Sequence, residues 1–181
     1  MTSYVALLRG VNVGGNKMVA MAELRDMLAK LGFADAKTLL QSGNAVFRCA
    51  AKPPAKLEAF LEAETKKRLG LTCDFHVRTA GELQDAIDAN PLKAEAQKDP
   101  SRFLVSFFKA PLDQAKVKAA QSAIVGPEIV RCDGRHLYMY YPNGQADSKA
   151  GLVVGKALGV NGTARNWNTV LKLAALSGAK T

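Results

Sequence analysis

The feature that most constrains the fold is the order in which strand-like and helix-like segments follow one another in the first half of the chain. Short apolar runs bounded by glycine, asparagine or proline indicate strands, and apolar residues at three- and four-residue spacing indicate helices. The predicted order is strand, helix, strand, strand, helix, strand and helix, at residues 4–9, 21–31, 38–41, 45–49, 55–69, 72–78 and 79–89. This is the split βαβ, or ferredoxin-like, order followed by one helix.

A second run of the same element types follows residues 90–100, a polar segment with a proline near each end that is typical of a linker. The predicted segments beyond it are a strand at 103–108, a helix at 112–124, a hairpin of 128–132 and 136–141, and helices at 148–158 and 164–176. We therefore predict an α+β fold of two ferredoxin-like (βαββαβ-type) halves with extra C-terminal helices. The N-terminal half covers residues 1–90 and the C-terminal half covers residues 100–181. The repetition is visible only in the order of the elements.

The composition excludes several classes of protein. A chain of 181 residues buries roughly 70% of its unfolded surface, so it needs neither disulfides nor a structural metal. The three cysteines are widely spaced and there are only two histidines, so we predict no metal site and no cofactor. Apolar runs fall short of the roughly 18 residues of a membrane span, and the first one is too short for a signal peptide. We expect a cytoplasmic protein without membrane contact.

The formal net charge of +9 is unevenly divided along the sequence. Residues 1–99 hold 14 Lys and Arg against 12 Asp and Glu, whereas residues 100–181 hold 11 against 4. Clustered positive charge raises the local concentration of phosphates, so the C-terminal half is expected to meet an anionic partner. The alternative is a basic surface that serves only solubility.

The strand predicted at 136–141 places His136, Tyr138 and Tyr140 on one face. Aromatic side chains on such a sheet stack on bases in RNA-binding modules. The RNP1 sequence pattern of those modules is missing here, and aromatic residues favour strands for packing alone. We therefore favour packing as the role of this face.

The loop from Gly10 to Lys17 is glycine-rich and connects the first strand to the first helix. Backbone N–H groups around Gly14 and Gly15 are able to converge on a phosphate, and Lys17 supplies a point charge. Arg9 at the base of the loop and Asn12 within it complete the candidate site. The alternative is a long connection that needs its glycines for left-handed turns.

The segment from Thr163 to Leu173 is predicted to start a helix, with Thr163 as its cap. Arg165, Asn166 and Asn168 then form a polar, partly basic cluster near the helix start, where N–H groups and the helix dipole favour an anion. Ser148 and Lys149 begin the preceding predicted helix in the same way. The alternative is an amphipathic helix anchored by a tryptophan, which explains the apolar stripe but not the polar cluster.

Five segments together resemble a known family. They are ALLRGVNVGGNKMVAMAEL at 6–24, LLQSGNAVF at 39–47, HVRTAGEL at 76–83, the region 147–149, and TARNWNTVLKL at 163–173. On these residues the chain is similar to the bacterial domain-of-unknown-function family 1697 over nearly its whole length. The resemblance implies two ferredoxin-like halves and implies no activity.

We predict that the protein binds an anionic, phosphate-bearing ligand through Arg9, Lys17, Lys149 and Arg165. The ligand is either a nucleic acid or a small molecule, and an anion site needs convergent donors, so the loop and the predicted helix start should lie close together. Two alternatives remain open. One is an enzyme with its site between these two segments, and the other is a protein-docking module.

Overall fold

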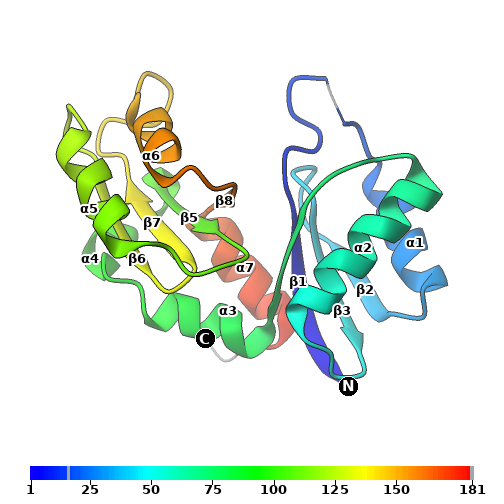
Figure 1. Cartoon of the computed structure of the whole chain (residues 1–181). Helices are drawn as coiled ribbons and strands as arrows, with labels where there is room; N and C mark the ends of the chain where they lie inside the picture. Colours follow the sequence, from blue (N-terminus) through cyan, green and yellow to red (C-terminus); the bar gives the residue numbers. More distant parts are fainter. Residues whose placement is uncertain (16, 180–181) are drawn as a thin grey trace. The chain divides into compact units, whose positions relative to one another are not determined.

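The computed structural model describes residues 1–15 and 17–179 of the chain (Figure 1). Its elements fall into two compact units. The first unit comprises Met1–Asp85 and Lys172–Thr181, and the second unit comprises Ala86–Leu171.

The first unit holds a four-stranded antiparallel sheet with the strand order β2-β3-β1-β4. Its elements are β1 (Thr2–Leu8), α1 (Met21–Lys30), β2 (Ala34–Thr38), β3 (Asn44–Cys49), α2 (Pro54–Leu69), β4 (Phe75–Thr79) and the start of α3 (Ala80–Asp88). The chain order is βαββαβ, which confirms the ferredoxin-like arrangement predicted from the sequence.

One face of this sheet is covered by α1 and α2 (Figure 1). Leu24 and Leu28 of α1 and Leu57 and Leu61 of α2 are almost fully buried in the same core as Phe47 of β3. Each buried leucine contributes about 2 kcal/mol relative to an exposed one. The helical spacing of the leucines predicted α1, whereas α2 was predicted from Pro53 and Pro54 at its start and Gly70 at its end.

The second unit repeats this topology with the strand order β6-β7-β5-β8. After α4 (Lys93–Lys98) and a 3₁₀ turn (Pro100–Arg102), its elements are β5 (Phe103–Phe107), α5 (Gln114–Ala123), β6 (Ile129–Asp133), β7 (His136–Tyr140), α6 (Ala150–Leu158), β8 (Thr163–Asn166) and the start of α7 (Trp167–Ser177). The fold is therefore α+β, with two βαββαβ sheets and a C-terminal helix.

The aromatic face of β7 is packed inside the protein. Tyr138 and Tyr140 are 0% and 8% exposed, and the Tyr138 hydroxyl donates to the Ala86 carbonyl at 2.6 Å. Burial raises the pKa of the Tyr138 hydroxyl above its usual range. Because these rings are buried, they are not a platform on which bases stack, and the packing interpretation is confirmed.

The prediction of a helix from residue 164 is wrong at its start. Residues 163–166 form β8, the fourth strand of the second sheet, and α7 begins only at Trp167. The pattern of buried Thr163, exposed Ala164 and buried Arg165 has the period of two that a strand requires. Four residues are too few to show this period in the sequence, and alanine and arginine favour helices.

Two other expectations need correction. The segment 90–100, predicted as a polar linker, contains α4, and α6 begins at Ala150 rather than at Ser148. Counted over the two units, the charges are 14 Lys and Arg against 9 Asp and Glu in the first, and 11 against 7 in the second. The positive excess is therefore shared, because the acidic residues between 86 and 99 belong to the second unit.

Within residues 1–15 and 17–179, no helix is long and apolar enough to cross a bilayer. The same part of the chain has no cluster of three or more His, Cys, Asp or Glu side chains suited to a metal ion. Cys49, Cys73 and Cys132 are free thiols.

Candidate anion-binding segments

The glycine-rich loop of residues 10–17 leaves the end of β1 beside the segment that leads into β4. The Arg9 N–H donates to the Asp74 carbonyl at 2.9 Å, and its Nη1 lies 3.3 Å from Asp74 Oδ2. Both side chains are partly exposed, at 39% and 46%, so this ion pair is screened by water and weak. Arg9 is thus held at the base of the loop while still reaching solvent.

The side chain of Asn12 holds the loop in place through hydrogen bonds to its backbone and to the neighbouring turn. Its Nδ2 donates to the Val19 carbonyl at 2.9 Å and to the Gln41 carbonyl at 2.7 Å, and its Oδ1 accepts from the Val19 N–H at 2.8 Å. The Asn12 N–H also donates to the Lys17 carbonyl at 3.2 Å. These four bonds close the loop and tie it to the β2–β3 turn. In this structure the amide of Asn12 shapes the loop.

The tip of the loop is open. Gly14 and Gly15 have left-handed φ angles of 62° and 77°, and a Cβ built on either would meet no atom within 4 Å. Lys17 is exposed, and its positive charge lowers the pKa of the Cys73 thiol against the larger effect of burial, which raises that pKa to about 11. Lys17 and Arg9 therefore act on neighbouring residues, Cys73 and Asp74. Asn16 lies outside the described residues.

Ser148 and Lys149 precede α6. The Ser148 Oγ donates to Glu128 Oε1 at 2.5 Å and accepts from the Ala150 N–H at 3.2 Å. The hydroxyl is therefore used by a carboxylate and by the helix start, and the Glu128 charge would repel an anion there. Lys149 is exposed and occupies the N-cap position of α6.

Arg165 is a buried strand residue and not an exposed residue of a first helical turn. Its Nη1 donates to Thr163 Oγ1 at 2.7 Å and to the Ala164 carbonyl at 2.8 Å, and the residue is 8% exposed. Burial lowers the pKa of its guanidinium to about 10. The prediction that Arg165 lies in the first turn of a helix is therefore wrong, because Arg165 belongs to β8 and α7 begins after it.

Asn166 and Asn168 mark the true start of α7. The Asn166 Oδ1 accepts from the Asn168 N–H at 3.0 Å, as an N-cap residue does, and its Nδ2 donates to the Ser101 carbonyl at 2.8 Å. Trp167 packs edge-on against Phe103, with ring centroids 5.4 Å apart. Asn168 itself is exposed. Asn166 thus caps α7 and fastens it to the segment before β5.

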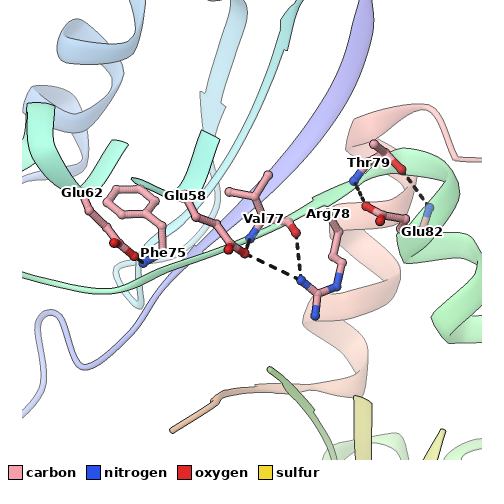
Figure 2. A network of polar contacts seen from close by, with 7 residues as sticks. All are labelled: Glu58, Glu62, Phe75, Val77, Arg78, Thr79 and Glu82. Atoms are coloured by element: carbon pink, nitrogen blue, oxygen red, sulfur yellow. Dashed lines mark hydrogen bonds and ion pairs between the residues drawn. The ribbon is translucent and has the colours of Figure 1, made fainter. Parts of the chain in front are cut away.

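A second buried arginine, Arg78 of β4, was missed by the sequence analysis. It is 0% exposed, its Nη1 donates to the Val77 carbonyl at 2.8 Å, and the same nitrogen lies 4.0 Å from Glu58 Oε1 (Figure 2). Arg78 pairs with Val5 of β1 as Arg165 pairs with Val105 of β5. A signal was present in the sequence, since an arginine comes two residues before a helix in both VRTA and ARNW.

Three glutamates cover the backbone of β4 at the edge of the first sheet (Figure 2). The N–H groups of Phe75 and Val77 donate to Glu62 and Glu58 of α2, each at 2.9 Å, and the Thr79 N–H donates to Glu82 of α3 at 2.8 Å. Glu82 and Thr79 also form a capping box, because the Glu82 N–H donates to Thr79 Oγ1 at 3.0 Å.

The comparison with protein families matches residues 1–138 to the model described as protein of unknown function, DUF1697. The chain belongs to the DUF1697 family. Among solved structures, this DUF1697 protein is similar to the conserved bacterial protein SP0830 from Streptococcus pneumoniae. That match has a TM-score of 0.75 and 24% identity, and it covers 97% of this chain and 98% of that chain. This likeness shows the shared fold alone. The comparison with curated proteins gave no match.

The DUF1697 model ends before β8, so the family match includes the glycine-rich loop but not the segment around Arg165. The predicted site residues are divided between the units. Arg9, Asn12, Gly14, Gly15 and Lys17 lie in the first, and the second contains Ser148, Lys149, Arg165, Asn166 and Asn168. The convergence of the two groups stays a prediction.

Proposed function

We propose that the protein binds an anionic, phosphate-bearing ligand at the glycine-rich loop of residues 10–17. The observation that supports this proposal is that hydrogen bonds of Asn12 hold the loop, while its tip at Gly14 and Gly15 is open and lies beside the exposed, positively charged Lys17. Asn12 holds the loop through four hydrogen bonds, while Gly14 and Gly15 leave open space beside their backbone. Backbone that hydrogen bonds already hold in place loses less conformational entropy when it binds a ligand.

Two cations support an anion at this loop. Lys17 is exposed and contributes a mobile ammonium group, and Arg9 is held at the loop base by a solvent-screened contact with Asp74. Such a contact contributes about 0 to 1 kcal/mol, so the ion pair with Asp74 opposes only weakly a contact between Arg9 and a phosphate. Turned glycine backbones offer N–H donors to the same group.

The fold favours a small phosphate-bearing molecule over a long nucleic acid. Tyr138 and Tyr140 are buried, and the positive excess is shared between the units instead of being concentrated in one of them. Single-stranded nucleic acid binding depends on exposed aromatic side chains and a charged groove along the backbone. We therefore place pyrophosphate-containing small molecules first and nucleic acid second.

The test is a calorimetric titration with pyrophosphate, ATP and a short single-stranded oligonucleotide, repeated over a salt series. We expect Lys17→Ala to weaken pyrophosphate and ATP binding about tenfold to a hundredfold, the range for a hydrogen bond to a charged group. Lys56→Ala removes the same charge from an exposed position of α2 and should leave the affinity unchanged. Equal effects of the two variants would contradict the proposed site.

The salt series separates the two ligand classes. Nucleic-acid affinity should fall by roughly one power of salt concentration for each phosphate contacted, whereas a small ligand at one loop should show a shallow dependence. A steep dependence with the oligonucleotide and no binding of pyrophosphate would favour the nucleic-acid alternative.

A further inference from the structure

The second unit contains a groove that the proposed anion site does not use. It lies between α5 and β6 and has a volume of about 580 Å³. Val117 and Val130 contribute buried apolar surface to its lining, while Lys118 and Arg131 are exposed at its sides. One wall is an edge strand, because β6 is the first strand in the order β6-β7-β5-β8.

This edge is regular enough to accept another strand. β6 pairs with β7 over five consecutive residues, from Ile129 opposite Tyr140 to Asp133 opposite His136, without a shift of register. The Val130 N–H points away from β7, since it donates to Gln121. Alternate residues of an antiparallel strand turn their polar groups to the same side. Cys132 therefore also turns its N–H and C=O groups to the free edge.

Gln121 of α5 occupies part of this edge as one residue of an added strand would. Its Oε1 accepts from the Val130 N–H at 2.7 Å, and its Nε2 donates to the Glu128 carbonyl at 3.2 Å. A residue in a parallel strand makes this same pair of bonds, one on each side of the residue that it faces. The side chain thus defines the register of a parallel neighbour. The residue of that neighbour two places further on would donate to the Val130 carbonyl and accept from the Cys132 N–H.

Arg131 fills the next acceptor on the edge. Its Nη1 donates to the Val130 carbonyl at 2.7 Å and to Gln121 Oε1 at 3.0 Å. A peptide N–H arriving at Val130 would replace this bond with an equivalent one, and it would release an exposed guanidinium beside the groove. The released guanidinium and Lys118 favour carboxylates on the incoming chain, because both charged side chains that line the groove are cationic.

We propose that this groove binds an extended acidic peptide, which adds to β6 as a parallel strand. Main-chain hydrogen bonds to Val130 and Cys132 supply the affinity, as in other cases of strand addition. Alternate side chains of the peptide pack on the apolar lining, and its carboxylates meet Lys118 and Arg131. The partner is therefore a protein segment of acidic, strand-forming sequence.

The probe is a synthetic peptide of alternating valine and glutamate, titrated into the isotopically labelled full chain, with a valine and lysine peptide as its control. We expect the glutamate peptide to shift amide resonances of α5 and β6 and to slow hydrogen exchange at the Cys132 N–H. The lysine peptide should cause neither change. No shift with the glutamate peptide, or equal shifts with both peptides, would overturn the proposal.

Two variants test the mechanism. Cys132→Pro removes the outward N–H and should abolish binding, whereas Cys132→Val keeps the N–H and should preserve it; proline is tolerated at edge positions of this kind. Lys118→Glu should weaken the glutamate peptide about fivefold, the factor that corresponds to about 1 kcal/mol for an exposed charge pair. If Cys132→Pro fails to fold, the affinity of the Lys118→Glu variant for the glutamate peptide is the deciding measurement, and an unchanged affinity would overturn the proposal. Equal binding by the proline and valine variants would overturn the proposal. A peptide-independent dimer that Cys132→Pro abolishes would also do so, since it assigns the edge to a second copy of the chain.

Discussion

β4 in the first unit and β8 in the second occupy the same place in their sheets, and each carries a buried arginine one residue before its end. Each arginine faces a valine of the central strand and donates to the carbonyl of the residue before it. Each strand then ends in a residue that caps the next helix, Thr79 before α3 and Asn166 before α7. Two sheets with different sequences share these features, so we infer that the fold requires them.

The units differ in their loops and in their sheet edges. The β1–α1 connection contains the glycine-rich loop, while the shorter β5–α5 connection has no counterpart of it among the described residues. The edge of β4 is covered by three glutamates, of which Glu58 is buried. The strand β6, which takes the place of β2 and not of β4 in the second sheet, is covered by Gln121 and the exposed Arg131. The features that both units contain thus support the fold, whereas the features found in one unit are the candidates for function.

The largest expected effect tests the shared arginines. Arg78→Ala and Arg165→Ala should each lower the free energy of unfolding by about 3 kcal/mol, because each removes a large buried side chain and leaves its hydrogen-bond partners unsatisfied. Arg25→Ala, at an exposed position of α1, should change stability by about 0.5 kcal/mol or less. Denaturant unfolding measures all three. If Arg165→Ala is as stable as Arg25→Ala, Arg165 does not have the structural role of Arg78, and it becomes a candidate ligand-binding residue again.

The next effect distinguishes the glutamates that cover β4. Glu58→Ala should cost about 3 kcal/mol, since it leaves Arg78 without its buried carboxylate and Val77 without its acceptor. Glu62→Ala should cost about 1 kcal/mol, because Glu62 is only partly buried and accepts from the Phe75 N–H. Unfolding in urea provides the comparison. Equal losses in the free energy of unfolding would show that the contact between Arg78 and Glu58 does not stabilise the fold.

A smaller effect concerns the two glycines at the loop and the adjacent turn. A Cβ on Gly43 would lie 2.5 Å from Val11 Cγ2 and 2.9 Å from Leu8 Cβ, whereas a Cβ on Gly14 would meet open space. Both have left-handed φ angles, so Gly14→Ala should cost about 1 kcal/mol and Gly43→Ala about 2 to 3 kcal/mol. Thermal unfolding measures the difference. A smaller loss for Gly43→Ala would mean that β1 and the turn are not packed as described.

The smallest effect is a pH dependence of stability that arises from buried thiols and phenols. Burial raises the pKa of Cys73 in the first unit from 9.0 to about 11, and that of Tyr141 in the second from 10.0 to about 12. A raised folded-state pKa gives stability that is present below the unfolded pKa and lost as the pH rises through the folded one. Stability should therefore begin to fall above pH 9, where Cys73 contributes together with Cys49 and Cys132, whose pKa values burial also raises. Cys73→Ala should reduce the slope there by about 1 kcal/mol per pH unit in unfolding experiments. If Cys73→Ala leaves the pH dependence of the unfolding free energy unchanged, the Cys73 thiol is exposed to water and not buried.

Most of the fold could be predicted from local signals. The leucine spacing in α1, the capping box from Thr79 to Glu82 and the turn around Gly43 each depend on residues close together in the sequence. β8 was missed because the burial that makes Arg165 a strand residue comes from packing with β5. The fold class was right because one missing strand left the order of the other elements intact.

The candidate site was less predictable, because the roles of its side chains depend on distant partners. Asn12 binds the carbonyl of Gln41, and Ser148 binds the carboxylate of Glu128. The sequence shows neither contact, so both residues were taken as ligand contacts. Arg9 and Lys17 keep their predicted character, since charge and exposure at a glycine-rich loop follow from the local sequence.

We propose above that the glycine-rich loop of the first unit binds phosphate groups. Residue-resolved amide shifts during a titration with pyrophosphate test it most directly, using the labelled full chain and the Lys17→Ala variant. We expect the largest shifts at Gly14, Gly15 and Lys17, and we expect Lys17→Ala to reduce them greatly. Shifts centred on Lys149 or on the start of α7, or no saturable shift at the loop, would contradict it.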